Sequence, residues 1–180
     1  MKRIDFLKRK MQGYLKKEQL LKDEEYIKLE KPYLRKARKN FTIANMLLKI
    51  SDEDSLKKVL KLASDFETFD WVIIVAYYAM YTSALAALSK LGFKSKSHAI
   101  TLVILEYYYV QQQRDLEIKY LHKLSNAYRL SEDLINKLIQ TKIRRETAQY
   151  DATPSISGEN AKTALEDADE FITRIEEILS

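Results

Sequence analysis

The stretch WVIIVAYYAMYTSALAALS, residues Trp71 to Ser89, decides the fold of this 180-residue chain. It holds no charged residue, and Asp70 and Lys90 bracket it. A run of this length can span a membrane by hydropathy alone, but the hydroxyl groups in its middle would find no partners in lipid. Small residues recur at helical spacing, which lets another helix approach closely: Ala76, Ala79, Ser83, Ala86 and Ala87. The stretch therefore predicts a buried central helix.

Amphipathic segments elsewhere in the chain predict helices that cover this central one. Apolar residues at alternating spacings of three and four run through residues 31–50, where Pro32 suits a helix start. Ser51 is a candidate N-cap for a short helix that ends near Ala63. A loop at residues 150–157 precedes a last helix, which Ser157 can cap and which carries the cleanest apolar stripe in the chain.

The turn after the central helix reads GFKSKSH, residues 92–98. Gly92 suits the end of a helix, and Ser95 or Ser97 suits the N-cap of a second apolar helix from His98 to about residue 110. Amphipathic helices are also expected at residues 114–129 and 132–148. With three Gly, two Pro and no segment of strand periodicity, the sequence predicts an all-α, up-and-down bundle of four to five long helices with short extra helices.

Charge is distributed unevenly along the chain. Residues 1–39 hold fourteen Lys or Arg against six Asp or Glu, whereas residues 151–180 hold eight acids against two bases. A basic N-terminus can meet phosphate, an acidic partner, a membrane surface or the acidic end of its own fold. Gly13 interrupts the apolar pattern, so we expect a short helix, a break and a loosely docked arm. The predicted organisation is a basic helical arm at residues 1–30 and a helical bundle domain at residues 31–180.

The composition also limits the chemistry of the chain. Cysteine is absent, which excludes disulfides, thiolate zinc sites and cysteine nucleophiles, and suits a reducing cytosol. Two histidines, His98 and His122, are too few for a His-rich metal site, and the sequence contains no Gly-rich phosphate loop. The N-terminus lacks an apolar core long enough for a signal peptide. We therefore expect a cytoplasmic protein with no metal, no other cofactor and no membrane insertion.

The tyrosines are numerous, twelve against one tryptophan, and could suggest a stacking surface for single-stranded nucleic acid. Because Tyr77, Tyr78 and Tyr81 belong to the most apolar helix, we expect them instead to pack in the core with satisfied hydroxyl groups.

Five short motifs follow one another along the chain. They are RKARKNF at residues 35–41, AYYAMY at 76–81, KSKSH at 94–98, RRETAQYD at 144–151 and DADEFI at 167–172. Their order and spacing resemble the HEPN domain (higher eukaryotes and prokaryotes nucleotide-binding), particularly its small stand-alone prokaryotic and archaeal members. The resemblance covers about residues 31–180. It implies a helical bundle that often forms a homodimer and pairs with a minimal nucleotidyltransferase, in many cases as toxin and antitoxin.

The resemblance also implies a site. Active members of the family are metal-independent endoribonucleases in which four to six residues separate an Arg from a His. Such a His can move a proton at the ribose 2′-hydroxyl while the Arg stabilises charge at phosphorus. Here Arg144 and Arg145 are in place, but Tyr150 holds the His position. Tyrosine titrates at about pH 10 and is a poor general base at neutral pH.

The residues expected to contact nucleotide or RNA come from two segments. They are Arg144, Arg145, Tyr150 and Asp151 near the end of the predicted helix 132–148, and Lys96 and His98 at the start of the second apolar helix. Arginine suits phosphate, tyrosine can stack on a base, and free N–H groups at a helix start attract phosphate. The catalytic residues stay unassigned among Arg145, Tyr150 and His98. The alternative for His98 is a structural role that locks the turn onto the bundle.

Three functions remain open at this level. The first is a regulatory or toxin-like HEPN module that binds nucleotide or RNA, forms a homodimer and works beside a nucleotidyltransferase. The second is a metal-independent ribonuclease that uses Arg145, with His98 or Tyr150 in place of the usual His. The third is a non-catalytic structural assembly protein whose charged ends mediate contacts. The missing His favours the first.

Overall fold

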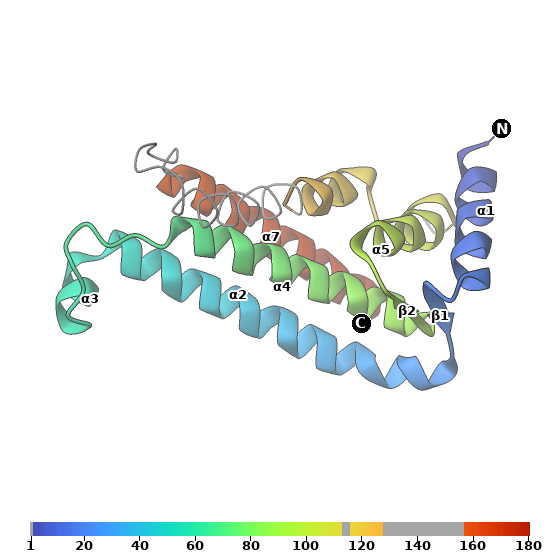
Figure 1. The fold of residues 1–180 in the computed structure, drawn as a ribbon, viewed down its shortest axis with the longest axis horizontal. Coiled ribbons are helices and arrows are strands. Elements are labelled where there is room, and N and C mark those ends of the chain that lie inside the picture. The colour runs from blue at the N-terminus through green and yellow to red at the C-terminus, as the bar shows by residue number, and fades with distance from the viewer. Residues whose placement is uncertain (1, 113–115, 128–156) are drawn as a thin grey trace, which may run out of the picture.

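The computed structural model describes residues 2–112, 116–127 and 157–180. Three long helices form its centre, namely α2 (Glu30–Asp52), α4 (Phe69–Lys90) and α7 (Gly158–Leu179). Figure 1 shows α2 and α4 running antiparallel side by side, and α7 packs on both of them. The shorter helices α3 (Asp54–Val59) and α5 (His98–Leu105) lie toward opposite ends of the molecule, and residues 118–127 are also helical. The prediction of an all-α helical bundle is confirmed.

The central helix α4 is buried, as the sequence predicts. Fourteen of its side chains are buried, and it contacts α2, α5 and α7. Its small residues face other helices of the same chain, where Ala37 and Ala44 of α2 are also fully buried. In the part of the chain that the structure describes, α4 is the one helix long and apolar enough to cross a membrane, but 78% of its most apolar window is buried inside the protein.

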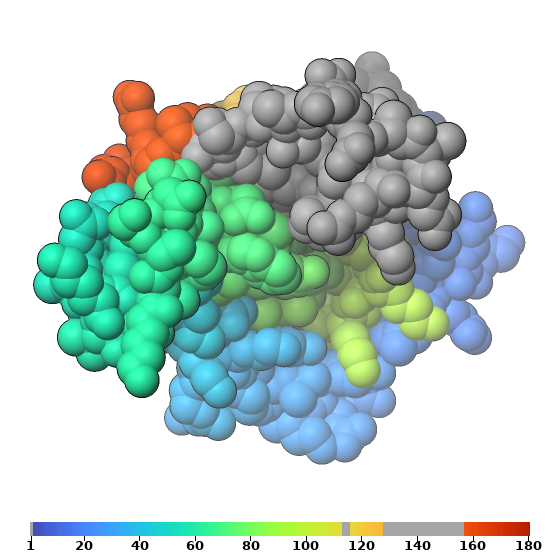
Figure 2. Space-filling model, turned by 60° about the vertical axis from the view of Figure 1, so that its left-hand side comes forward, coloured from blue at the N-terminus to red at the C-terminus, as the bar shows by residue number. Residues whose placement is uncertain are grey.

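One stripe of α4 reaches the surface, and Figure 2 shows this part of the helix beside α2. Trp71 and Tyr78 lie on the stripe, seven residues apart, and are 53% and 45% exposed. Tyr77 is buried, as expected, and Tyr81 is half-buried. The expectation that Tyr78 packs in the core is wrong, because none of the described elements covers its side of the helix.

The N-terminal segment forms α1 (Arg3–Lys16), β1 (Leu20–Lys22) and the short 3-10 helix η1 (Glu24–Leu29). The helix α1 continues through Gly13, where we expected a break, and it packs on α5 and on the π-helix η2 (Glu106–Gln112) that follows α5. Leu7 and Met11 are buried in this contact. The N-terminal helix is therefore packed on the bundle rather than loosely docked, while the division at residue 30 stays a prediction.

A two-stranded antiparallel sheet joins this segment to the turn after α4. In it β1 pairs with β2 (Phe93–Ser95), and Leu20 lies opposite Ser95. Gly92 precedes β2 with a φ of 72°, and a Cβ there would lie 3.1 Å from the carbonyl oxygen of Asp23. Gly92 thus ends α4 as predicted. The strands themselves were not predicted, because three residues are too few to show a periodicity.

Two of the serines predicted as helix N-caps are confirmed, and the prediction for a third is wrong. Ser97 accepts the Ile100 N–H at the start of α5, and Ser157 accepts the Asn160 N–H at the start of α7. Ser51, in contrast, lies within the last turn of α2 and caps no helix. Its buried hydroxyl accepts the Thr68 N–H at 2.8 Å and contacts the Thr68 hydroxyl at 2.9 Å, so it holds the loop before α4.

Candidate functional site

The turn between α4 and α5 carries the two predicted site residues that the structure describes, Lys96 and His98. Lys96 is exposed, and its backbone N–H donates to the carbonyl of Gln19 at 3.1 Å, which joins the turn to the segment after α1. His98 is the first residue of α5 and is only 9% exposed. The two side chains therefore differ in environment, one at the surface and one in the core.

The imidazole of His98 lies among tyrosines of α4. Its Nδ1 is 3.3 Å from the hydroxyl of Tyr77, and its ring centroid is 5.8 Å from that of Tyr77 and 5.7 Å from that of Tyr81. Burial lowers the pKa of His98 to about 4, because desolvation disfavours the charged ring. The ring is consequently neutral at pH 7. This environment supports the structural alternative, in which His98 locks the start of α5 onto α4.

The remaining predicted site residues are Arg144, Arg145, Tyr150 and Asp151, and all four lie outside the described residues. Their roles stay predictions. Within the described ranges, no group of three or more His, Cys, Asp or Glu side chains could hold a metal ion.

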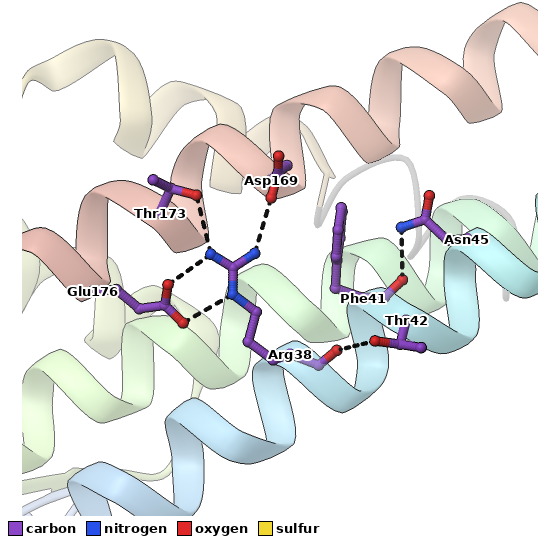
Figure 3. A network of polar contacts seen from close by, with 7 residues as sticks. All are labelled: Arg38, Phe41, Thr42, Asn45, Asp169, Thr173 and Glu176. Atoms are coloured by element: carbon purple, nitrogen blue, oxygen red, sulfur yellow. Dashed lines mark hydrogen bonds and ion pairs between the residues drawn. The ribbon is translucent and has the colours of Figure 1, made fainter.

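A polar cluster that the sequence did not predict joins α2 to α7. Figure 3 shows the guanidinium of Arg38 pointing at α7, where it donates to both carboxylate oxygens of Glu176 at 2.9 and 2.6 Å. It also donates to Asp169 at 2.9 Å and to the Thr173 hydroxyl at 3.1 Å. The hydrogen bond to Glu176 is the main reason that the pKa of Arg38 is raised. We refer to Arg38, Asp169, Thr173 and Glu176 as the α2–α7 clasp.

The α2–α7 clasp shows one partner of the basic N-terminal segment, namely the acidic end of its own fold. Arg38 belongs to the basic N-terminal third and its partners to the acidic C-terminal segment, so the two ends of the chain meet each other here. Lys123 of the helical segment 118–127 also pairs with this acidic segment, since its ammonium group contacts Asp167 at 2.6 Å and pairs with Glu170. Arg38 lies in RKARKNF and Asp169 in DADEFI, and this pairing of oppositely charged motifs was the signal available in the sequence.

Comparison with known families agrees with this architecture. The family model described as HEPN domain matches residues 53–178, which begin at the end of α2 and run almost to the end of α7. The chain therefore belongs to the HEPN domain family, which is generally linked to RNA binding or ribonuclease activity. A search of curated proteins finds no match to the chain. The matched residues leave out α1, β1, η1 and all of α2.

Proposed function

We propose that this protein is a HEPN-type module that binds nucleotide or RNA without cleaving it, as the regulatory or toxin-like partner of a minimal nucleotidyltransferase. The observation that carries the proposal is the state of His98. Tyr150 replaces the His of the family's ribonuclease motif, so another residue would have to move the proton. His98 is buried against Tyr77 and Tyr81 with its pKa lowered to about 4, so at pH 7 its ring carries no proton to donate as a general acid and is a weak general base. The other histidine, His122, is exposed in the helical segment 118–127.

A single assay separates binding from cleavage. A labelled single-stranded RNA is incubated in EDTA with wild type, Arg145→Ala and His98→Asn, and each reaction is divided between a native and a denaturing gel. We expect wild type to retard the RNA and leave it intact, and Arg145→Ala to retard it less, because an arginine at a phosphate site is lost. Cleavage by wild type that disappears in Arg145→Ala would instead establish the ribonuclease. Loss of that cleavage in His98→Asn would assign the proton transfer to His98.

We also propose that the protein forms a homodimer through the exposed stripe of α4. HEPN domains commonly dimerise, and Trp71 and Tyr78 offer apolar surface that a monomer would leave in water. Met46 of α2 adds a third large side chain, at 58% exposure. Light scattering of wild type should give twice the mass of one chain, and Trp71→Glu should give one chain. Ile27→Glu, which replaces an apolar residue of similar exposure on η1, is the matched control and should stay dimeric.

The nucleotidyltransferase partnership is tested by capture. Tagged wild type should recover a minimal nucleotidyltransferase encoded in the same genome. Failure to recover such a protein, together with no affinity for nucleotide or RNA, would contradict the proposal. Self-association that salt does not change, without any nucleic-acid affinity, would favour the structural assembly protein, since phosphate binding weakens steeply with salt.

A further inference from the structure

The helix α1 and the two-stranded sheet lie at one end of the molecule (Figure 1), and both carry exposed lysines. We refer to five of them as the basic face: Lys8 and Lys16 of α1, Lys17 just after it, Lys94 of β2, and Lys96. The helix α1 lies outside the residues that the family model matches, so its charge is a feature of this chain that family membership does not explain.

Backbone pairing brings four of these lysines, Lys16, Lys17, Lys94 and Lys96, to the same end of the fold. Lys16 and Lys17 come just before Gln19, whose carbonyl accepts the N–H of Lys96 at 3.1 Å. One residue further, Leu20 pairs with Ser95 in the sheet. Lys94 lies in β2 and Lys96 in the bend just after it, and both are exposed. Lys16 and Lys94, which are 78 positions apart in the sequence, are thus held within one end of the fold.

Among the described residues, no acidic side chain pairs with the lysines of the basic face. Residues 2–17 hold seven bases against one acid, Asp5. The nearest acidic group in sequence is Glu18, while Glu25 pairs with Lys28 and Asp23 accepts the Glu25 N–H. At the opposite end, around α3, residues 49–70 hold four bases against six acids. The excess of positive charge therefore lies in the N-terminal part of the chain, in residues 2–17 and in residues 31–39 of α2, which hold five bases and no acid.

We infer that the basic face binds the phosphate backbone of RNA, an inference that rests on the proposed function. Phosphate contacts depend on lysine and arginine charge and need no apolar groove. Lys8 and Lys16 lie eight residues apart, which is about 12 Å along α1 at 1.5 Å per residue, so they can contact different phosphates of one strand. These lysines are point charges on flexible stems, which suits contacts along a backbone without sequence selection.

Two other partners fit the basic face less well. A basic amphipathic helix binds a membrane by burying its apolar side, but Leu7 and Met11 are already buried within the protein. A protein partner would need aromatic or aliphatic anchors. Met46, Trp71 and Tyr78 lie on α2 and α4, and none of the described residues of α1, β1 or β2 is a large exposed apolar side chain. Ile27 of η1 is the single such residue between β1 and α2.

The test compares two variants with the same loss of charge. The basic-face variant carries Lys16→Gln, Lys17→Gln and Lys96→Gln, and the control carries Lys49→Gln, Lys58→Gln and Lys61→Gln at exposed positions of the α3 end. Affinity for a labelled single-stranded RNA is measured by fluorescence anisotropy at several salt concentrations, and circular dichroism melting verifies that both variants are folded. We expect the basic-face variant to lose at least tenfold in affinity at 0.1 M salt, and its salt slope to fall by about 2, since each single-strand phosphate contact contributes about 0.7.

The outcomes separate this inference from the proposed function. Retention of RNA affinity by the control and its loss in the basic-face variant supports the inference. Equal affinity of the two folded variants would overturn it and leave the proposed function intact. No RNA binding by wild type would overturn both. Binding of wild type to vesicles of phosphatidylserine and phosphatidylcholine, lost in the basic-face variant and without RNA binding, would assign the surface to a membrane and overturn the inference.

Discussion

Basic residues do different work in two regions of this molecule. At the α2–α7 clasp, Arg38 donates hydrogen bonds to three partners from the acidic end of the chain. On the basic face, Lys16 and Lys96 are exposed and form no ion pair with a described residue. In the sequence, the segments that carry Arg38 and Lys16 look alike, because both are amphipathic and rich in lysine and arginine. The difference arises from the tertiary neighbours alone, so a charged run indicates a binding surface only once the fold shows that nothing neutralises it.

The largest effect is expected where the basic helix α1 meets the core. Leu7→Ala should lower the free energy of unfolding by about 2–4 kcal/mol, because Leu7 is 1% exposed and its truncation leaves a cavity. The measurement is urea denaturation followed by circular dichroism. The control Ile27→Ala, at an exposed apolar position, should change the free energy by less than about 0.5 kcal/mol. A cost near zero for Leu7→Ala would show that α1 is a loosely docked arm after all.

The next effect depends on pH and concerns His98, beside the turn that carries Lys96. Its pKa is about 4 in the folded protein against about 6.5 in the unfolded chain, so the unfolded state binds more protons between these values. Stability contributed by the neutral ring is therefore present above about pH 6.5 and decreases toward pH 4, by on the order of 2–3 kcal/mol. Urea midpoints at pH 7, 5.5 and 4 should fall less in His98→Asn than in wild type.

His122→Asn is the matched control for that experiment, because His122 is exposed. It should keep the pH dependence of wild type. If His98→Asn and wild type lose stability in parallel, His98 is not held neutral by burial, and a role in proton transfer becomes open again.

A smaller effect is expected at the α2–α7 clasp. Arg38→Ala should cost about 1–2 kcal/mol of stability, since Arg38 and Glu176 are each about one-third exposed and solvent weakens their bidentate pairing. Arg38→Lys should recover part of this loss, because a lysine keeps the charge without the two-pronged geometry. Lys39→Ala, at the exposed neighbouring position, is the control and should stay within about 0.5 kcal/mol of wild type. Equal losses of stability in Arg38→Ala and Lys39→Ala would show that the hydrogen bonds of the clasp do not stabilise the fold.

The smallest effect is a gain at the end of α1. Glu18 has a φ of 54°, and the Gln19 N–H closes the helix end on the carbonyl of Tyr14 at 2.9 Å. Glu18→Gly should stabilise the protein by about 0.5–1 kcal/mol, because glycine adopts this left-handed conformation without strain. Gln12→Gly, within the helix, should instead cost about 1 kcal/mol. Since Glu18 borders the basic face, its removal should not reduce RNA affinity. A loss of stability in thermal melting would exclude strain at Glu18.

Local signals in the sequence predicted much of this fold. The uncharged run from Trp71, the turn glycine Gly92 and the caps Ser97 and Ser157 are each decided by a few neighbouring residues, and the structure confirms them. The two three-residue strands and the inward hydroxyl of Ser51 depend on partners distant in sequence, and sequence reasoning missed them.

The candidate site was less accessible to sequence reasoning. Lys96 and His98 were identified together from one turn, but the burial that separates their roles is set by Tyr77 and Tyr81 on another helix. The α2–α7 clasp joins residues 131 to 138 positions apart, and spacing along the chain cannot show such a pairing. The motif from Arg144 to Asp151 lies outside the described residues, and its role stays a prediction.

The most direct test of the central claim measures stability and RNA affinity on the same two variants. We predict that Arg38→Ala loses about 1–2 kcal/mol of unfolding free energy with an RNA affinity within twofold of wild type. The Lys16→Gln, Lys17→Gln and Lys96→Gln variant should lose at least tenfold in RNA affinity, with an unfolding free energy within about 0.5 kcal/mol of wild type. A basic-face variant that loses stability but keeps its RNA affinity would contradict the account, as would a clasp variant that stays fully stable and binds RNA poorly.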